Sequence, residues 1–294
     1  MVIKGAKERF YQIVISSIVV LLAFITAFPL YYTVLNSLTP EAEMRRRTVV
    51  VYPTQLTTAA YEVILTDPRI PPAMLVTVER TLVGTALTLI FTTVGAYILS
   101  RKRLPGRKWL IAFVMVTVVF GGGLVPSFLT VMNVGLLDTF WALVIPGLVD
   151  SWGLLVIKLF YEGMPKEMEE AAFIDGASEM QHFLRIALPT SVPVLAAIGL
   201  FNAVGHWNSW FDAMLYLTTS KRIPMQLLVR NIMQGLAMLS AMAGSHQPPP
   251  VLKITNSDAI KMAMVVVATV PILCVYPFLQ KYFAKGVFMG AVKG

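Results

Sequence analysis

Charged residues are scarce in this chain, and their scarcity excludes an ordinary water-soluble domain. Only 14% of the 294 residues are charged and 56% are hydrophobic, whereas soluble domains carry about 25% charged residues. A chain of this composition cannot bury its apolar surface in one water-soluble core, so it needs lipid as its solvent. The sequence therefore predicts a membrane protein.

Cysteine and histidine are also nearly missing. Cys274 is the single cysteine and lies in an apolar run, which excludes an intramolecular disulfide framework and predicts a small packing residue. Histidines 182, 206 and 246 are too scattered along the chain for a metal site. An intramembrane enzyme needs a nucleophile and base, or metal ligands, at workable spacing, and the sequence offers neither.

Apolar runs of about 20 residues, the length of a membrane helix, occur six times. The first follows a basic start, but its uncharged run from Phe10 to Pro40 is longer than the signal-peptide core of about 7 to 15 residues, so we expect an uncleaved span. In the third, Gly121–Gly123 and Pro126 predict a bend. The sequence thus predicts an all-α membrane protein with one domain over 1–294 and spans at about 11–35, 81–100, 109–131, 139–161, 186–215 and 262–283.

The two longer connections, about 36–80 and 216–261, are more polar, and we expect them to cap the spans outside the membrane. Neither has enough apolar periodicity for a core of its own. They contain the basic triplet Arg45–Arg47 and the proline run Pro248–Pro250. The triplet is either an ordinary solvated segment or a surface that steers an acidic sugar or an acidic partner protein.

The net charge of +8 does not indicate nucleic-acid binding, because the basic residues form short clusters beside apolar runs without interleaved aromatics. Such clusters orient membrane helices, since lysine and arginine are enriched in cytoplasmic loops. Six spans place both termini on one side. The clusters favour cytoplasmic termini, although Arg45–Arg47 on the opposite side counts against it; the largest cluster is Arg101, Lys102, Arg103, Arg107 and Lys108.

One loop, 163–185, mixes acids, small residues and turn formers between two apolar runs. Pro165 suits a helix start, acidic residues follow in the first turn, and Gly176 is a helix stop. Ser178 and Gln181 have the spacing of a capping box for a second helix towards Pro189. This helix, turn and helix either packs on its own bundle or presents a docking surface to another protein.

The same segment carries a longer motif. EAA, three residues, Gly, nine residues, Ile, one residue and Leu-Pro stand at Glu170, Ala171, Ala172, Gly176, Ile186, Leu188 and Pro189. This pattern resembles the signature of permease subunits of bacterial ABC importers. MPKEMEEAA, IDGAS and WNSWF are similar to the carbohydrate, maltose-permease-like branch, and the ending YPFLQKYFAKGVFMGAVKG is similar to its oligosaccharide and polysaccharide members, which include the alginate importer.

The resemblance implies a type I importer permease fold in the bacterial inner membrane, with the 163–185 loop as a coupling helix that docks on a cytoplasmic ATPase. It implies that Glu170 contacts the ATPase, that Ala171 and Ala172 permit close approach, and that Gly176 makes the turn. Asp175 belongs to the same set of ATPase-coupling residues. The implied partners are a second permease subunit, two ATPase subunits and an external solute-binding protein. This chain would bind no cofactor, since ATP and Mg belong to the ATPase and no segment here resembles its phosphate-binding loop.

A second group of residues is a candidate for the substrate pathway. An ionisable residue in a span is a functional candidate by default, and aromatic faces beside hydrogen-bonding groups suit sugar hydroxyls. Local pairing and an interfacial aromatic belt are the structural alternatives. A self-contained secondary transporter, the other alternative function, needs coupling acids in several spans, and only Asp150 and Asp212 qualify. The candidates are Asp150, Trp152, Asn202, Asn208, Trp210 and Asp212, with His206 and Trp207 beside them.

Overall fold

A computed structural model describes residues 6–47, 51–218, 222–243 and 258–291, and all regular elements in these ranges are helical. His246, Pro248–Pro250 and the side chain of Arg45 lie outside the described parts. The chain divides into two compact units. Unit 1 comprises residues 1–70 and 229–270, and unit 2 comprises residues 71–228 and 271–294.

Unit 1 begins with one long helix, α1 (Ala6–Ser37), whose apolar side chains are exposed over most of its length. Two short helices, α2 (Glu41–Arg46) and α3 (Ala59–Leu65), follow. Ser37 Oγ at the end of α1 lies 2.6 Å from the hydroxyl of Tyr61 in α3. The division between the units falls inside α13 (Met225–Ala243) and α15 (Asp258–Ala291).

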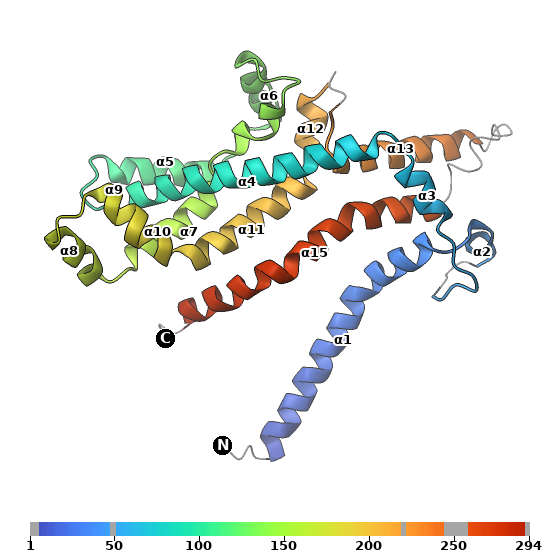
Figure 1. Cartoon of the computed structure of the whole chain (residues 1–294), viewed down its shortest axis with the longest axis horizontal. Helices are drawn as coiled ribbons and strands as arrows, with labels where there is room; N and C mark the ends of the chain where they lie inside the picture. Colours follow the sequence, from blue (N-terminus) through green and yellow to red (C-terminus); the bar gives the residue numbers. More distant parts are fainter. Residues whose placement is uncertain (1–5, 48–50, 219–221, 244–257, 292–294) are drawn as a thin grey trace. The chain divides into compact units, whose positions relative to one another are not determined.

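Unit 2 contains helices α4, α5, α7 and α11, which lie alongside one another (Figure 1). Short helical turns connect them. The elements are α4 (Ile70–Ser100), α5 (Arg107–Val119), α6 (Leu124–Asn133), η1 (Phe140–Leu143), η2 (Ile145–Gly147), α7 (Ser151–Glu162), α8 (Lys166–Ile174), α9 (Glu179–His182), η3 (Phe183–Ala187), α10 (Leu188–Thr190), α11 (Val192–Asn208) and α12 (Phe211–Tyr216).

Helices overlap each of the six expected residue ranges, and three of these ranges contain a break or a sharp bend. Among the described residues, α1 and α4 are each long and apolar enough to cross a membrane, and three bent helix pairs bring the total to as many as five. The expected span 262–283 lies within α15. The all-helical prediction is confirmed, whereas the number of six spans stays a prediction.

The predicted bend in the third span is confirmed. Helices α5 and α6 meet at 115°, and the break contains Gly122 and Gly123 with positive φ of 69° and 92°. Glycine adopts this backbone region without the Cβ clash that other residues suffer. The glycine run therefore ends α5 at Val119 and redirects the chain.

Two helices were not anticipated at their observed lengths. Helix α4 begins at Ile70 rather than near residue 81, because Glu79 and Arg80 interrupt the apolar run without interrupting the helix. Helix α13 occupies much of the expected cap 216–261. Charged residues lower hydropathy but retain good helix propensity, so an apolar run underestimates the length of a helix.

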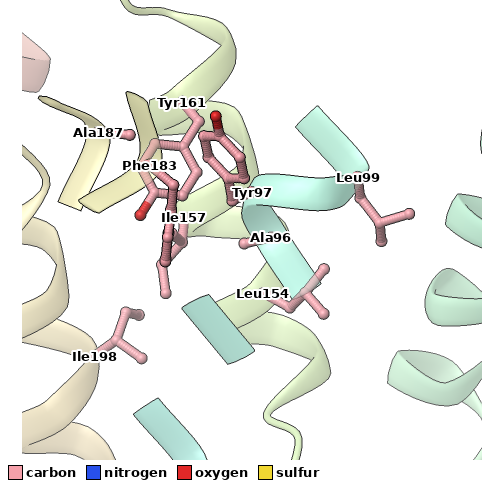
Figure 2. Close-up of a cluster of buried hydrophobic side chains, with 9 residues drawn as sticks. All are labelled: Ala96, Tyr97, Leu99, Leu154, Ile157, Tyr161, Phe183, Ala187 and Ile198. Atoms are coloured by element: carbon pink, nitrogen blue, oxygen red, sulfur yellow. The ribbon is translucent and has the colours of Figure 1, made fainter. Parts of the chain in front are cut away.

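An apolar cluster holds α4, α7 and α11 together in unit 2. Its buried members include Tyr97, Ile157, Phe183 and Ile198, which converge from four elements (Figure 2). The ring centroids of Tyr97 and Phe183 are 4.7 Å apart, and Tyr161 contacts Tyr97 edge to face at 5.7 Å. The cluster fixes the end of α4 against the C-terminal end of the 163–185 loop and the residues that follow it.

Close packing of α4 on α11 depends on Gly84. A Cβ atom at Gly84 would lie 2.6 Å from Nε2 of His206 in α11. A Cβ at Gly205, also in α11, would meet no atom of the described residues within 4 Å. We expect Gly84→Val to destabilise the protein by about 1–3 kcal/mol through overpacking. Thermal unfolding in detergent, followed by tryptophan fluorescence, measures this, and Gly205→Val is the control. Equal unfolding midpoints for the two variants would contradict the close approach of α4 and α11 at Gly84.

Candidate functional site

The 163–185 loop folds as its sequence predicts. Pro165 is the N-cap of α8, and Glu167 and Glu169 lie in the first turn, where negative charge interacts favourably with the helix dipole. At the other end, the amide of Gly176 donates to the carbonyl of Phe173 at 3.1 Å, and the amide of Ala177 donates to the carbonyl of Ala172 at 3.0 Å. This pair of bonds is a Schellman motif.

Gly176 supplies the left-handed residue that this motif requires, with φ of +80°. Immediately afterwards, Ser178 and Gln181 form the predicted capping box: the Gln181 side chain accepts from the Ser178 amide at 2.8 Å, and the Ser178 hydroxyl accepts from the Gln181 amide at 3.3 Å. Helix α9 then continues through the π turn η3, which contains buried Phe183, towards Pro189.

The coupling candidates differ in exposure. Glu170, Ala171, Asp175 and Gly176 are exposed, and Ile174 beside them is 85% exposed. Ala172 is different, because it is only 8% exposed and packs within this chain. Helix α8 thus presents one face with an acid, a small residue and an apolar residue to its surroundings.

Five residues form a polar cluster on the inner side of this loop, which we call the Arg101 cluster: Tyr97, Arg101, Glu169, Glu179 and His182. Arg101, at the end of α4, donates from Nη1 to Oε1 of Glu169 at 2.6 Å, and its Nη2 contacts the Tyr97 hydroxyl. The Arg101 Nη2 to His182 Nδ1 distance is 2.8 Å. Its Nε lies 3.5 Å from Oε2 of Glu179, an ion pair without hydrogen-bond geometry.

The protonation state of His182 follows from these contacts. A guanidinium has only donors, so Nδ1 of His182 accepts and the ring proton lies on Nε2. The ring stacks on Phe173 of α8 with centroids 5.6 Å apart. The Tyr97 hydroxyl lies 3.0 Å from Oε2 of Glu179 and 3.0 Å from His182 Nδ1, so the cluster joins α4 to both helices of the loop.

Sequence reasoning missed the Arg101 cluster. It treated Arg101 as one of several orienting charges, and it weighed His182 only as a metal ligand. One local signal was present, because Tyr97 lies in the last turn of α4 and Arg101 follows four residues later, a spacing that lets the two side chains meet. What distinguishes Arg101 from Lys102 and Arg103 is burial, which the sequence does not give. The Arg101 side chain is 19% exposed, whereas its two neighbours are exposed.

Two of the pathway candidates, Asp150 and Asn202, come together. Asp150 is the N-cap of α7: its Oδ1 accepts from the Gly153 amide at 2.9 Å, and its Oδ2 accepts from Nδ2 of Asn202 at 3.2 Å. The Asp150 amide donates to the hydroxyl of Thr92 in α4 at 3.1 Å. Residues of α4, α7 and α11 thus meet at one polar point.

Asp212, another pathway candidate, pairs with Arg80 of α4, which sequence reasoning had placed in an external loop. Nη1 of Arg80 donates to Oδ1 of Asp212 at 3.2 Å and to the Ser209 carbonyl at 3.3 Å, and Nη2 contacts Oδ2 of Asp212. The Arg80 side chain is 3% exposed and that of Asp212 is 28% exposed. This partly buried ion pair ties α4 to the break between α11 and α12.

The remaining pathway candidates lie nearer the surface. Trp152 is 52% exposed and meets Phe201 edge to face, with ring centroids 6.1 Å apart. Trp210 is 36% exposed and contacts Phe211 in the same way at 5.7 Å. Asn208, at the end of α11, is exposed.

The basic triplet in unit 1 is partly engaged within its own loop. Arg47 pairs with Glu43 at 3.3 Å, and the Glu43 carboxylate accepts from the hydroxyl and amide of Thr54. The hydrogen bonds from Thr54, followed by the charge of Arg47, hold the pKa of Glu43 below its usual value. Arg46 is exposed.

Comparisons with known proteins cover nearly the whole chain. The family model for the binding-protein-dependent transport system inner membrane component matches residues 2–289. Protein LplC of Bacillus subtilis (strain 168) is 41% identical over 270 residues, which cover 92% of this chain and 90% of that protein. The polygalacturonan/rhamnogalacturonan transport system permease protein YtcP of the same organism is 38% identical over 291 residues, which cover 98% of this chain and 100% of that protein.

A solved structure matches as well. A chain in the crystal structure of a bacterial ABC transporter involved in the import of the acidic polysaccharide alginate superposes with a TM-score of 0.84 and 28% sequence identity. The match covers 96% of this chain and 100% of that one.

Proposed function

Since this chain belongs to the family of binding-protein-dependent transport system inner membrane components, and is a permease subunit of an ABC importer for sugars or oligosaccharides, we propose that it moves acidic oligosaccharides inward by ATP-driven alternating access. It works as one half of a permease heterodimer in the cytoplasmic membrane, with both termini in the cytoplasm. Two ATPase subunits bind ATP and Mg, and an external solute-binding protein delivers the oligosaccharide. This chain itself carries no cofactor.

The observation that carries this proposal is the exposed face of α8. Glu170, Ala171 and Ile174 point away from their own bundle, while the Schellman turn at Gly176 and the capping box after it fix the direction of the helix. A small, rigid helix with one acid and one apolar side chain suits a cleft on a partner protein. Glu170 and Asp175 contact the ATPase, Ala171 permits close approach, and buried Ala172 seats α8 on its own bundle.

We assign the substrate pathway to the polar points of unit 2. Asp150 and Asn202 offer hydrogen-bonding groups where α4, α7 and α11 meet. Trp152 of α7, Asn208 at the end of α11, and Trp210 and Asp212 at the start of α12 add aromatic and polar groups. The acidic character of the substrate is supported by the relative named for polygalacturonan and rhamnogalacturonan and by the alginate transporter.

Reconstitution tests the proposed function. The permease pair, the ATPase and the binding protein are placed in proteoliposomes, and uptake of labelled trigalacturonate is measured with and without ATP. We expect uptake only when ATP and the ATPase are both present, and much weaker uptake of maltotriose. Uptake by the permease alone would make it a secondary transporter. Preference for the neutral sugar would overturn the substrate class only.

A further inference from the structure

We propose that Arg101 is the positioning residue that fastens the 163–185 loop to α4, so that a displacement of α8 moves α4 with it. This inference rests on the proposed function, because it concerns how force from an ATPase enters the helices. The transmission of movement from α8 to α4 is thus assigned to a side chain outside the exposed face of α8. Arg101 contacts no substrate and no ATP in this assignment.

The contacts of Arg101 reach both helices of the loop. Glu169 belongs to α8, whereas Glu179 and His182 belong to α9. A planar guanidinium with five donors holds several acceptors in fixed directions at once, which an ammonium group cannot do. Arg101 therefore locks the angle between α8 and α9 as well as their distance from α4.

The anchor on the α4 side is rigid. The guanidinium carbon lies 4.2 Å from the centroid of the Tyr97 ring, and that ring contacts both Tyr161 and Phe183 in the apolar cluster (Figure 2). The ion pairs and the apolar cluster thus act at the last turn of α4 and at the residue that follows it, and α4 continues without a break from Ile70 to Ser100. A pull on Arg101 is transmitted along a single long helix.

Membrane orientation alone does not explain this arrangement. Lys102 and Arg103, the next two cations, are exposed, as charges that only orient the chain would be. Arg107 turns to the other side of the connection, where it contacts Glu162 at the end of α7 and donates to the Leu99 carbonyl at 2.8 Å. Within the described residues, Arg101 is the one cation of these four that makes hydrogen bonds or ion pairs with the 163–185 loop.

The strength of the attachment comes from the cluster as a whole. The Glu169 side chain is 44% exposed, and a solvent-exposed ion pair alone contributes little. Arg101 also holds His182, whose ring stacks on Phe173 of α8. Removing Arg101 therefore frees α8 more than removing Glu169 does.

The test compares Arg101→Gln with Lys102→Gln in the complete transporter. Lys102→Gln removes a neighbouring cation in the connection between α4 and α5. The measured quantity is the number of trigalacturonate molecules imported per ATP hydrolysed. We expect this ratio to fall about tenfold for Arg101→Gln, within the usual range of coupling between sites, while ATP hydrolysis continues. Lys102→Gln should keep the wild-type ratio. Equal ratios for the two variants would overturn the proposal.

A structural readout separates coupling from general damage. Spin labels at positions 109 and 174, whose native Trp and Ile side chains are 82% and 85% exposed, are introduced in a Cys274→Ser background, and their distance distribution is measured. We expect Arg101→Gln to broaden the distribution and Lys102→Gln to leave it unchanged. If Arg101→Gln fails to assemble, Glu169→Gln replaces it. We then expect a smaller fall in the number of sugar molecules imported per ATP and a smaller broadening of the distance distribution. A Glu169→Gln variant that changes neither quantity would overturn the proposal.

Uptake by the wild-type protein distinguishes a failure of the proposed function from a failure of the role proposed for Arg101. Uptake that needs no ATPase would contradict the proposed function before any variant is examined. ATP-dependent uptake by the wild type, together with an Arg101→Gln variant that matches Lys102→Gln, would remove only the role of Arg101.

Discussion

Replacing Gly176 by valine is expected to abolish import while the subunits still assemble and ATP is still hydrolysed. Gly176 has φ of +80°, a region that costs a residue with a Cβ atom roughly 1–2 kcal/mol and a β-branched one more. A Cβ there would meet nothing within 4 Å, so the effect arises from backbone strain rather than from a clash. Relief of that strain breaks the Schellman turn and changes the direction of α8.

Proteoliposome uptake and ATP hydrolysis, measured together, check this expectation. The matched control is Gly106→Val, because Gly106 also has positive φ, +71°, and open space around its Cβ position. It caps the start of α5 and lies outside the 163–185 loop, so the same strain should leave uptake largely intact. Equal loss of uptake in both variants would show that backbone strain anywhere in the protein, rather than α8 orientation, is responsible.

Asp212→Asn is expected to produce the largest loss of stability, about 3–5 kcal/mol. The substitution keeps the shape of the side chain but removes the one carboxylate among the described residues that pairs with Arg80, whose side chain is 3% exposed. Without its counter-ion, a buried cation has no favourable interaction that offsets the free-energy cost of removing its charge from water. Thermal unfolding of the purified protein in detergent measures the loss.

A second aspartate supplies the control. Asp67 pairs with Arg69 at 2.7 Å, but the Arg69 side chain is 64% exposed, so Asp67→Asn should cost less than about 1 kcal/mol. Adding Arg80→Met to Asp212→Asn should recover a large part of the stability, because no buried charge is then left unpaired. A similar loss in Asp67→Asn and Asp212→Asn, or no recovery in the double variant, would contradict the importance of the buried pair.

The local geometry of the 163–185 loop was predictable because its signals act over a few residues. Pro165, Gly176, Ser178 and Gln181 each specify a cap or a turn through backbone groups within five positions. The same reasoning located the bend at Gly121–Gly123. It was less successful with Ala172, because the sequence does not say which side of α8 faces its own bundle.

The pathway candidates show the limit of residue chemistry. Asp150 and Asp212 were both identified as ionisable groups near apolar runs, yet the structure gives them different surroundings. Asp150 caps α7 and accepts from Asn202, whereas Asp212 pairs with a buried arginine. Periodicity alone cannot distinguish these environments, since each depends on a partner in another helix.

The sequence by itself determined the membrane character, the helical class, the family resemblance and the shape of the 163–185 loop, because composition and short-range backbone chemistry decide these features. Only the tertiary structure decided which polar groups meet. Arg101 reaches Glu169 across 68 positions and His182 across 81, and Arg80 reaches Asp212 across 132. Such pairs form when whole helices pack in one register, and that register depends on the summed apolar contacts of many residues rather than on any local signal.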